Sequence, residues 1–141
     1  MKTAIIMIGL PGSGKSTYAK NIIIANPDCS SSYHSTDDFF MVDGKYCWSA
    51  ALLGPYHMRN VSDFKQSCEV GTNIVICDNT NLKTADRKKY IKIAEDAGYN
   101  VMCIQMHGKV TEEQIDLFAA RNSHGVSRAI ISSMAAAQAV L

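Results

Sequence analysis

Gly9-Leu10-Pro11-Gly12-Ser13-Gly14-Lys15-Ser16-Thr17 follows directly on the apolar run Ala4–Ile8, a combination typical of a phosphate-binding P-loop. Its glycines let the backbone turn N–H groups inward around a polyphosphate, at dihedral angles that most residues avoid. The loop is expected to open a helix at Lys15, whose N-terminal N–H groups and dipole favour an anion. The stretch therefore predicts a nucleotide-binding loop between a strand and a helix.

The loop residues have separate roles in holding ATP and Mg²⁺. The Lys15 ammonium can reach the β- and γ-phosphates as a point charge, and the Ser16 hydroxyl can ligate Mg²⁺. The residues expected to bind the nucleotide are Gly12, Ser13, Gly14, Lys15, Ser16 and Thr17. A glycine turn that merely joins two packed elements is the alternative explanation of the pattern.

Length and composition predict a single domain over residues 1–141. The net charge is +1 and 19% of residues are charged, so no global field draws the chain to nucleic acid or membrane. Apolar runs are all shorter than the roughly 20 residues that span a bilayer. Five cysteines without a C-x-x-C pair favour free thiols in a reducing cytoplasm over disulfides or a structural zinc site.

Strand-like and helix-like segments alternate along the chain. The expected strands are Ala4–Ile8, Ser32–Ser35, Asn73–Cys77 and Asn100–Met106. The expected helices are Lys15–Ala25, Tyr56–Val70, Thr84–Ala97 with Thr84 as N-cap, Thr111–Arg121 behind a capping box, and an Ala-rich helix from Arg128 to the C-terminus, with an irregular stretch at Phe39–Pro55. This order predicts the α/β class and a P-loop NTPase fold: a short parallel sheet of about four strands, flanked by helices and carrying a lid.

Polar residues collect where the first three strands end. The P-loop follows the first strand, Asp37-Asp38 the second, and Asp78-Asn79-Thr80-Asn81 the third. Right-handed crossovers place all three ends at one edge of a parallel sheet, where ligands bind. These residues are therefore expected to share one site.

Asp37-Asp38 could supply the base of a phosphoryl transfer. A carboxylate beside an acceptor hydroxyl can take its proton, and Asp37 or Asp38 suits that role. One of the pair could instead cap the following helix, and the two roles are compatible.

Asp78 follows a buried strand as a Walker B aspartate does, so it is a candidate ligand of Mg²⁺, direct or through water. Asp38, Asn79, Thr80 and Asn81 are expected to contact the substrate. A strand-to-helix turn, where Asp and Asn are favoured, is the other explanation of these residues.

Arg121 and Arg128 flank a polar segment with a Gly125 hinge, which resembles a lid. Either arginine could stabilise charge on the transferring phosphoryl group, and surface ion pairs are the alternative. His57 and Asn60, three residues apart, could face the site or serve the core. Tyr46 and Trp48 are expected to be packing residues.

Four segments together resemble the polynucleotide 5′-hydroxyl kinase family of P-loop kinases, including the phage enzyme's kinase domain and eukaryotic polynucleotide-kinase-like relatives. They are Gly-x-Pro-Gly-Ser-Gly-Lys-Ser-Thr at 9–17, Ser-Thr-Asp-Asp-Phe-Phe at 35–40, Asp-Asn-Thr-Asn-Leu at 78–82 and Arg-Asn-Ser-His-Gly-Val at 121–126. The resemblance implies a tunnel with ATP at one end and a single-stranded 5′-hydroxyl end entering at the other. It implies Asp37 as general base, Lys15 and Ser16 as P-loop catalytic residues, and Arg121 as the start of the lid.

Two positions depart from the phage-type pattern. Phe39-Phe40 stand where that pattern has an arginine for the acceptor phosphate. His124-Gly125 stand where it has a second lid arginine, for which Arg128 is the substitute. Both departures concern the acceptor and lid side, and leave the ATP-binding residues in place.

The leading hypothesis is an ATP- and Mg²⁺-dependent kinase of the 5′-hydroxyl ends of DNA or RNA. A small-molecule or nucleoside kinase on the same scaffold is the first alternative, favoured by the near-neutral charge. A regulatory nucleotide-binding module is the second, although Asp37-Asp38 and a lid exceed what a switch needs. The sequence predicts neither the oligomeric state nor a choice between DNA and RNA.

Overall fold

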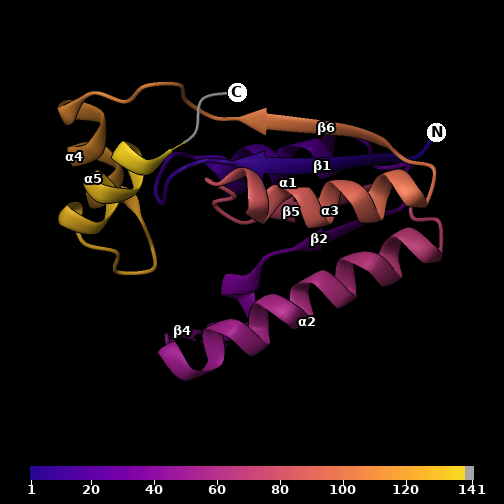
Figure 1. Ribbon diagram of the computed structural model, residues 1–141, viewed down its shortest axis with the longest axis horizontal. Helices are drawn as coiled ribbons and strands as arrows, with labels where there is room; N and C mark the ends of the chain where they lie inside the picture. Colours follow the sequence, from indigo (N-terminus) through magenta and orange to yellow (C-terminus); the bar gives the residue numbers. More distant parts are fainter. Residues whose placement is uncertain (139–141) are drawn as a thin grey trace.

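A computed structural model describes residues 1–138 and shows a parallel sheet with helices on both faces (Figure 1). In chain order the elements are β1 (Thr3–Ile8), α1 (Lys15–Ala25), β2 (Ser31–His34), the 3₁₀ helix η1 (Thr36–Phe40), β3 (Met41–Val42), β4 (Lys45–Tyr46), α2 (Ala50–Glu69), β5 (Ile74–Asp78), α3 (Thr84–Asp96), β6 (Asn100–Gln105), α4 (Glu112–Arg121) and α5 (Arg128–Ala137). The predicted α/β class and the short parallel sheet are confirmed. The predicted last helix is confirmed as far as Ala137, and its continuation over residues 139–141 lies outside the described residues.

The main sheet has the strand order β2-β5-β1-β6, and each neighbouring pair is parallel. In this register Met7 of β1 lies beside Asp78 of β5, and His34 of β2 lies beside Cys77. The carboxyl ends of the first three predicted strands therefore meet at one edge, as expected. That edge carries the P-loop, η1 and the segment after β5.

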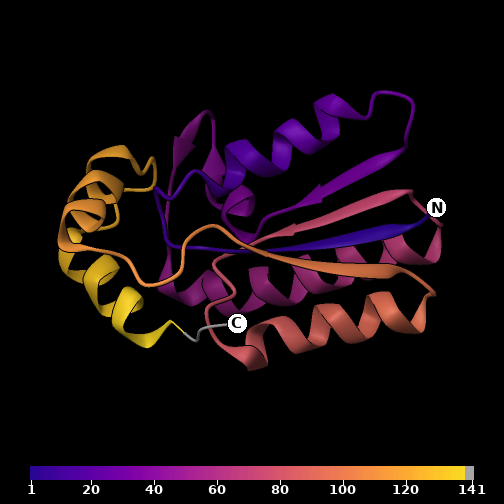
Figure 2. The same cartoon turned by 90° about the horizontal axis from the view of Figure 1, so that it is seen from above.

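The sheet buries a different set of side chains on each face, because strand side chains alternate. Ile5, Met7 and Ile76 pack toward α1, around Ala19. Figure 2 shows α1 on one side of the sheet and α2 with α3 on the other. The second face carries Ala4, Ile6, Val75 and Cys77, packed against Phe64, Cys68, Tyr90 and Ala94 of these two helices.

Helices α4 and α5 lie beyond the carboxyl ends of the strands rather than against a face of the sheet (Figures 1 and 2). A third apolar cluster joins them to the P-loop, and it is built on Leu10, Ile115, Phe118 and Ile131. Helix α4 begins with the predicted capping box, in which the Thr111 hydroxyl accepts from the Gln114 N–H and the Gln114 side chain accepts from the Thr111 N–H. The two helices thus form a unit placed at the mouth of the site.

The region after η1 is more regular than predicted. Strands β3 and β4 form a hairpin about Asp43 (φ 49°) and Gly44 (φ 79°), the left-handed pair that a tight hairpin turn requires. Helix α2 begins at Ala50, not at Tyr56, and Pro55 lies in its second turn. Pro55 removes only one main-chain hydrogen bond there, close to a helix end whose first N–H groups lack helical partners in any case.

Helix α3 begins at Thr84, but its N-cap is Lys83, so the prediction of Thr84 as N-cap is wrong. The Thr84 hydroxyl instead accepts a hydrogen bond from the Arg87 guanidinium. Within residues 1–138, every helix is too short or too polar to cross a membrane.

Candidate active site

The P-loop joins β1 to α1 and has the backbone geometry of a candidate anion-binding loop. Gly12 (φ 77°) and Gly14 (φ 89°) adopt the left-handed backbone conformation that the P-loop motif predicts for its glycines. Gly14 is the N-cap of α1 and has no side chain to satisfy the first N–H groups of the helix. Ser16 and Thr17 lie exposed in this first turn. The loop therefore offers backbone donors and a hydroxyl at one helix N-terminus, as the motif predicts.

Lys15 and Asp78 form a buried ion pair at the centre of the site. The Lys15 Nζ lies 2.9 Å from the Asp78 Oδ1, and the Asp78 side chain is 1% exposed. The Tyr33 hydroxyl donates to the other oxygen, Oδ2. Burial, together with the Asp78 charge, raises the pKa of Tyr33, so its hydroxyl stays protonated as a donor. The predicted metal ligand is thus held beside the P-loop lysine.

Asp37 accepts hydrogen bonds at both carboxylate oxygens. The Tyr46 hydroxyl, from β4, donates to Oδ1 at 3.0 Å, and the His124 Nδ1, from the α4–α5 connection, lies 3.3 Å from Oδ2. The rings of Tyr46 and His124 stack, with centroids 4.2 Å apart. A carboxylate between two elements remote in sequence is therefore clamped from both sides.

The clamp favours the ionised form of Asp37. Burial favours the neutral acid, but the hydrogen bonds of His124 and Tyr46 and the charge of Lys15 outweigh it and lower the pKa of Asp37. Asp37 is consequently a carboxylate at neutral pH. The influence of Lys15 also places this carboxylate within electrostatic range of the P-loop.

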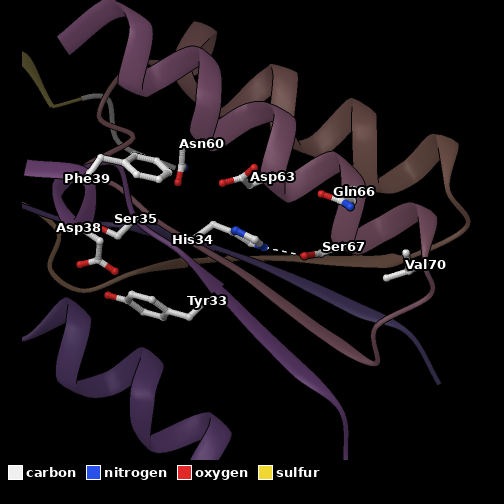
Figure 3. A pocket seen from close by; sticks show the side chains of 10 residues that line it. All are labelled: Tyr33, His34, Ser35, Asp38, Phe39, Asn60, Asp63, Gln66, Ser67 and Val70. Atoms are coloured by element: carbon white, nitrogen blue, oxygen red, sulfur yellow. Dashed lines mark hydrogen bonds between the residues drawn. The ribbon is translucent and has the colours of Figure 1, made fainter. Parts of the chain in front are cut away.

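Asp38, the next residue, has the opposite environment. Burial and the charges of Asp78 and Asp37 raise the pKa of Asp38, against the lowering effect of Lys20. Asp38 also turns to another side of η1: it lines a pocket between β2 and α2 (Figure 3), whereas Asp37 contacts Tyr46 of the hairpin and His124 of the lid. The two acids are thus separated in role by the tight turn of η1.

The segment after β5 holds strand ends together. The Asn79 Oδ1 accepts from the Thr36 N–H at 3.0 Å, and the Asn81 Nδ2 donates to the Met7 carbonyl at 2.8 Å. The Thr80 carbonyl accepts from the Gly9 N–H. The structure therefore places Asn79, Thr80 and Asn81, which were predicted to contact the substrate, at the edge of the site. Each of them makes a hydrogen bond within the protein there.

The two lid arginines differ in place. Arg121 Nε and Nη2 donate to the Gly12 carbonyl at 3.1 and 2.7 Å, so Arg121 sits on the P-loop. Arg128 pairs with two carboxylates of α4, those of Glu112 and Asp116. Of the two arginines predicted to meet the nucleotide, Arg121 lies at the loop, and Arg128 is engaged by α4.

Three residues of the site were missed by sequence reasoning: Tyr33, Tyr46 and His124. Tyr46 was expected only to pack, and it clamps Asp37. The Asp43-Gly44 pair was the available signal, because a tight hairpin folds Tyr46 back toward η1. Trp48, also expected to pack, is 57% exposed, so that prediction is wrong.

His57 and Asn60 both lie on the α2 face toward the site region. The His57 Nδ1 lies 3.0 Å from the Thr36 Oγ1 and so braces η1. The Asn60 Nδ2 donates to the Tyr90 hydroxyl at 2.9 Å within the core.

Residues 3–136 match the model of the family described as Chromatin associated protein KTI12. The chain belongs to this family. It is also 35% identical over 130 residues to the human (Homo sapiens) NEDD4-binding protein 2, a match that covers 92% of this chain and 7% of the relative. The chain therefore spans a small part of that much longer protein.

Solved structures similar to this chain have P-loop kinase folds. A chain of the Pnkp1/Rnl/Hen1 RNA repair complex matches with a TM-score of 0.73 at 17% identity, over 96% of this chain and 43% of that one. A gluconokinase from Sinorhizobium meliloti matches with a TM-score of 0.65 at 16% identity, over 97% of this chain and 75% of that one. The Mycobacterium tuberculosis APS kinase CysC, solved in complex with AMPPNP and APS, matches with a TM-score of 0.57 at 16% identity, over 84% of this chain and 70% of that one. The P-loop kinase fold implied by the resemblance is thereby confirmed.

Proposed function

We propose that this chain is an ATP-dependent kinase that transfers the γ-phosphate to the 5′-hydroxyl end of a polynucleotide. The observation that carries the proposal is Asp37: an ionised carboxylate outside the P-loop, within electrostatic range of Lys15, held at both oxygens. A protein that only binds nucleotide has no need of such a group. The resemblance in the segments at 35–40 and 78–82 supports a polynucleotide as the acceptor.

The donor set at the P-loop fits ATP and Mg²⁺. Backbone N–H groups from Gly12 to Thr17 and the Lys15 ammonium would hold the phosphates, while Ser16 and Asp78 are the oxygen ligands that Mg²⁺ prefers. The metal ion, when bound, supplies charge neutralisation at the transferring phosphoryl group. Tyr33 keeps the Asp78 carboxylate oriented toward the loop.

In the proposed transfer one bond to phosphorus forms, one breaks, and one proton moves. The acceptor hydroxyl oxygen forms a bond to the γ-phosphorus, the bond to the bridging oxygen of ADP breaks, and the hydroxyl proton passes to the Asp37 carboxylate. The hydroxyl takes the place of one of the two donors that hold Asp37. Arg121 moves from the Gly12 carbonyl to the transferring phosphoryl oxygens as the lid closes.

The acceptor class is tested by transfer from γ-labelled ATP. We expect label on 5′-hydroxyl oligonucleotides of DNA or RNA, and none on the same oligonucleotides that already carry a 5′-phosphate, because the reacting hydroxyl is then blocked. A panel of sugars, sugar acids and nucleosides is the matched comparison. Label on small molecules with none on oligonucleotides contradicts the proposal.

A small-molecule kinase is the second candidate. The net charge of +1 favours it, because a groove for nucleic acid usually carries an excess of positive charge. The gluconokinase and APS kinase likenesses support it only through the shared fold. The same panel separates the two, since this candidate predicts that label appears on a metabolite alone.

A regulatory nucleotide-binding module is the third candidate, and the family description as chromatin associated gives it support. It predicts ATP hydrolysis without transfer to any acceptor of the panel. The partner class and the cytoplasmic location expected from the sequence both remain predictions. All five cysteines are free thiols.

A further inference from the structure

A pocket lies between β2 with η1 on one side and α2 on the other, close to the sheet edge that carries the P-loop (Figure 3). Its volume is about 470 Å³, within the range of small-ligand pockets. Its walls are formed by Tyr33, His34, Ser35, Asp38, Phe39, Asn60, Asp63, Gln66, Ser67 and Val70. Ser35 lies directly before η1, and Asp38 and Phe39 lie within it, so the pocket shares η1 with the proposed base, Asp37.

The walls of this β2–α2 pocket are acidic or neutral. Asp38 and Asp63 contribute carboxylates. Burial lowers the pKa of His34, so its ring is neutral at pH 7, and its Nε2 lies 2.8 Å from the Ser67 hydroxyl. A phosphate inside these walls would face two carboxylates without a cation from the lining residues. The pocket therefore disfavours an anionic group.

Two cations stand beside the aromatic walls rather than among the lining residues. The Lys20 Nζ lies 5.2 Å from the centre of the Tyr33 ring, and the Arg59 guanidinium lies 4.5 Å from that of Phe39. The Arg59 Nε is also 3.9 Å from an oxygen of Asp63, in an exposed pair that contributes little stability. These cations suit phosphates outside the pocket, next to a neutral group within it.

The pocket presents hydrogen-bond acceptors that need donors. Asn60 is 1% exposed, and its Nδ2 is used by Tyr90, while its Oδ1 has no hydrogen-bond partner among residues 1–138. Figure 3 shows this oxygen on the pocket side of α2, near the Phe39 ring. With the oxygens of Asp38 and Asp63, the acceptors favour a ligand rich in N–H groups.

Aromatic rings line the same space. Tyr33, His34 and Phe39 contribute rings on which a planar group can stack (Figure 3). Stacking of a base on an aromatic side chain is worth about 1–3 kcal/mol. Rings for the faces and acceptors for the edge are the features by which proteins bind an unstacked base.

We propose that the β2–α2 pocket binds the terminal nucleobase of the acceptor and selects bases that carry an exocyclic amino group. This rests on the proposed function, because the base in the pocket is the terminal base of the oligonucleotide whose 5′-hydroxyl is phosphorylated. The amino group donates to the Asp63 carboxylate and the Asn60 carbonyl, and the phosphates stay outside. A polyol has no planar group that could stack on these rings.

The test measures nucleoside binding to the whole chain without ATP, by NMR chemical-shift titration. Cytidine and uridine differ at two neighbouring edge positions, because cytidine has an amino donor and a ring-nitrogen acceptor where uridine has a carbonyl acceptor and an N–H donor. Guanosine and inosine differ by one amino group alone and are the cleaner pair. We expect cytidine to bind about tenfold more tightly than uridine, and guanosine about tenfold more tightly than inosine, equivalent to about 1.4 kcal/mol. Ribose alone is expected to bind at least about tenfold more weakly than cytidine.

The variant Asp63→Asn offers a donor in place of one acceptor, and we expect it to abolish or reverse the preference for cytidine. Glu69→Gln removes the same charge from α2 at an exposed position outside the pocket and is expected to keep the preference. Equal binding of cytidine and uridine, equal binding of ribose, or an unchanged preference in Asp63→Asn overturns the proposal. The binding measurement needs no phosphoryl transfer. A protein that fails to transfer label can therefore still show the nucleoside preference, and a protein without the preference can still transfer label.

Discussion

Asp37 and Asp38 show that the pKa values of adjacent residues of one type can shift in opposite directions. The pKa of Asp37 is lowered by its hydrogen bonds to His124 and Tyr46, whereas burial and neighbouring carboxylates raise the pKa of Asp38. The residue pattern alone identified the pair and left open which acid serves as base, whereas the family resemblance implied Asp37. That choice depends on η1 and on partners 9 and 87 positions away, which no local pattern contains.

Loss of His124 is predicted to shift the acid limb of the pH–rate profile. Asp37 acts as base only when ionised, and His124 helps to lower its pKa, so His124→Ala raises that pKa and moves the acid limb of kcat/KM to higher pH. Below the limb, kcat/KM should fall by about fivefold, a modest factor because the Asp37 side chain is 43% exposed.

Tyr46→Phe should move the limb in the same direction, and Ser123→Ala, an exposed neighbour in the lid, should leave it in place. A profile of His124→Ala that superimposes on that of the parent contradicts the clamp.

At the scale of elements, the contact between the P-loop and α4 was not visible in the sequence. The motif predicted the loop, and the Thr111–Gln114 box predicted the start of α4. Neither pattern says that the two elements touch, because packing between them depends on the long-range cluster of Leu10, Phe118 and Ile131. The hairpin and the early start of α2 were missed for a related reason, since strands of two residues carry no periodicity.

Gly12→Ala is predicted to loosen this contact. A Cβ at Gly12 would lie 2.2 Å from the Phe118 carbonyl oxygen, and the φ of 77° is itself unfavourable for alanine. We expect a loss of about 2–4 kcal/mol in the free energy of unfolding and weaker ATP binding, measured by urea denaturation and calorimetry.

The control is Gly54→Ala in α2, where a Cβ meets open space and helix propensity should add about 0.5–1 kcal/mol. Equal stability of Gly12→Ala and the parent contradicts the packing described here.

At the scale of the molecule, topology assembles the site. The order β2-β5-β1-β6 puts the ends of β1, β2 and β5 side by side, and α4 with α5 closes the same edge. The sequence predicted the shared edge from the rule that crossovers in parallel sheets are right-handed. The position of the lid at that edge, which brings His124 to Asp37, had no equivalent rule.

Binding of ATP with Mg²⁺ is predicted to stabilise the folded chain. At about 100 times the dissociation constant, linkage gives about 2.7 kcal/mol, a rise in Tm of roughly 5–10 °C for a domain of this size. Lys15→Ala should lose most of this shift, because Lys15 supplies the point charge for the phosphates, whereas Lys65→Ala on the exposed face of α2 should keep it. Equal shifts in both variants contradict the assignment of the loop.

The central claim is that Asp37 takes the proton of the acceptor hydroxyl, and the most direct measurement compares Asp37→Asn with Asp43→Asn in transfer from γ-labelled ATP to a 5′-hydroxyl oligonucleotide. Asp43 is an exposed turn residue with a left-handed backbone that Asn also accepts, so its variant matches the charge change outside the site. The account predicts that Asp37→Asn lowers kcat by about 100-fold or more while the ATP-induced shift in Tm stays within about 2 °C of the parent. Transfer by Asp37→Asn at about the rate of Asp43→Asn would contradict it.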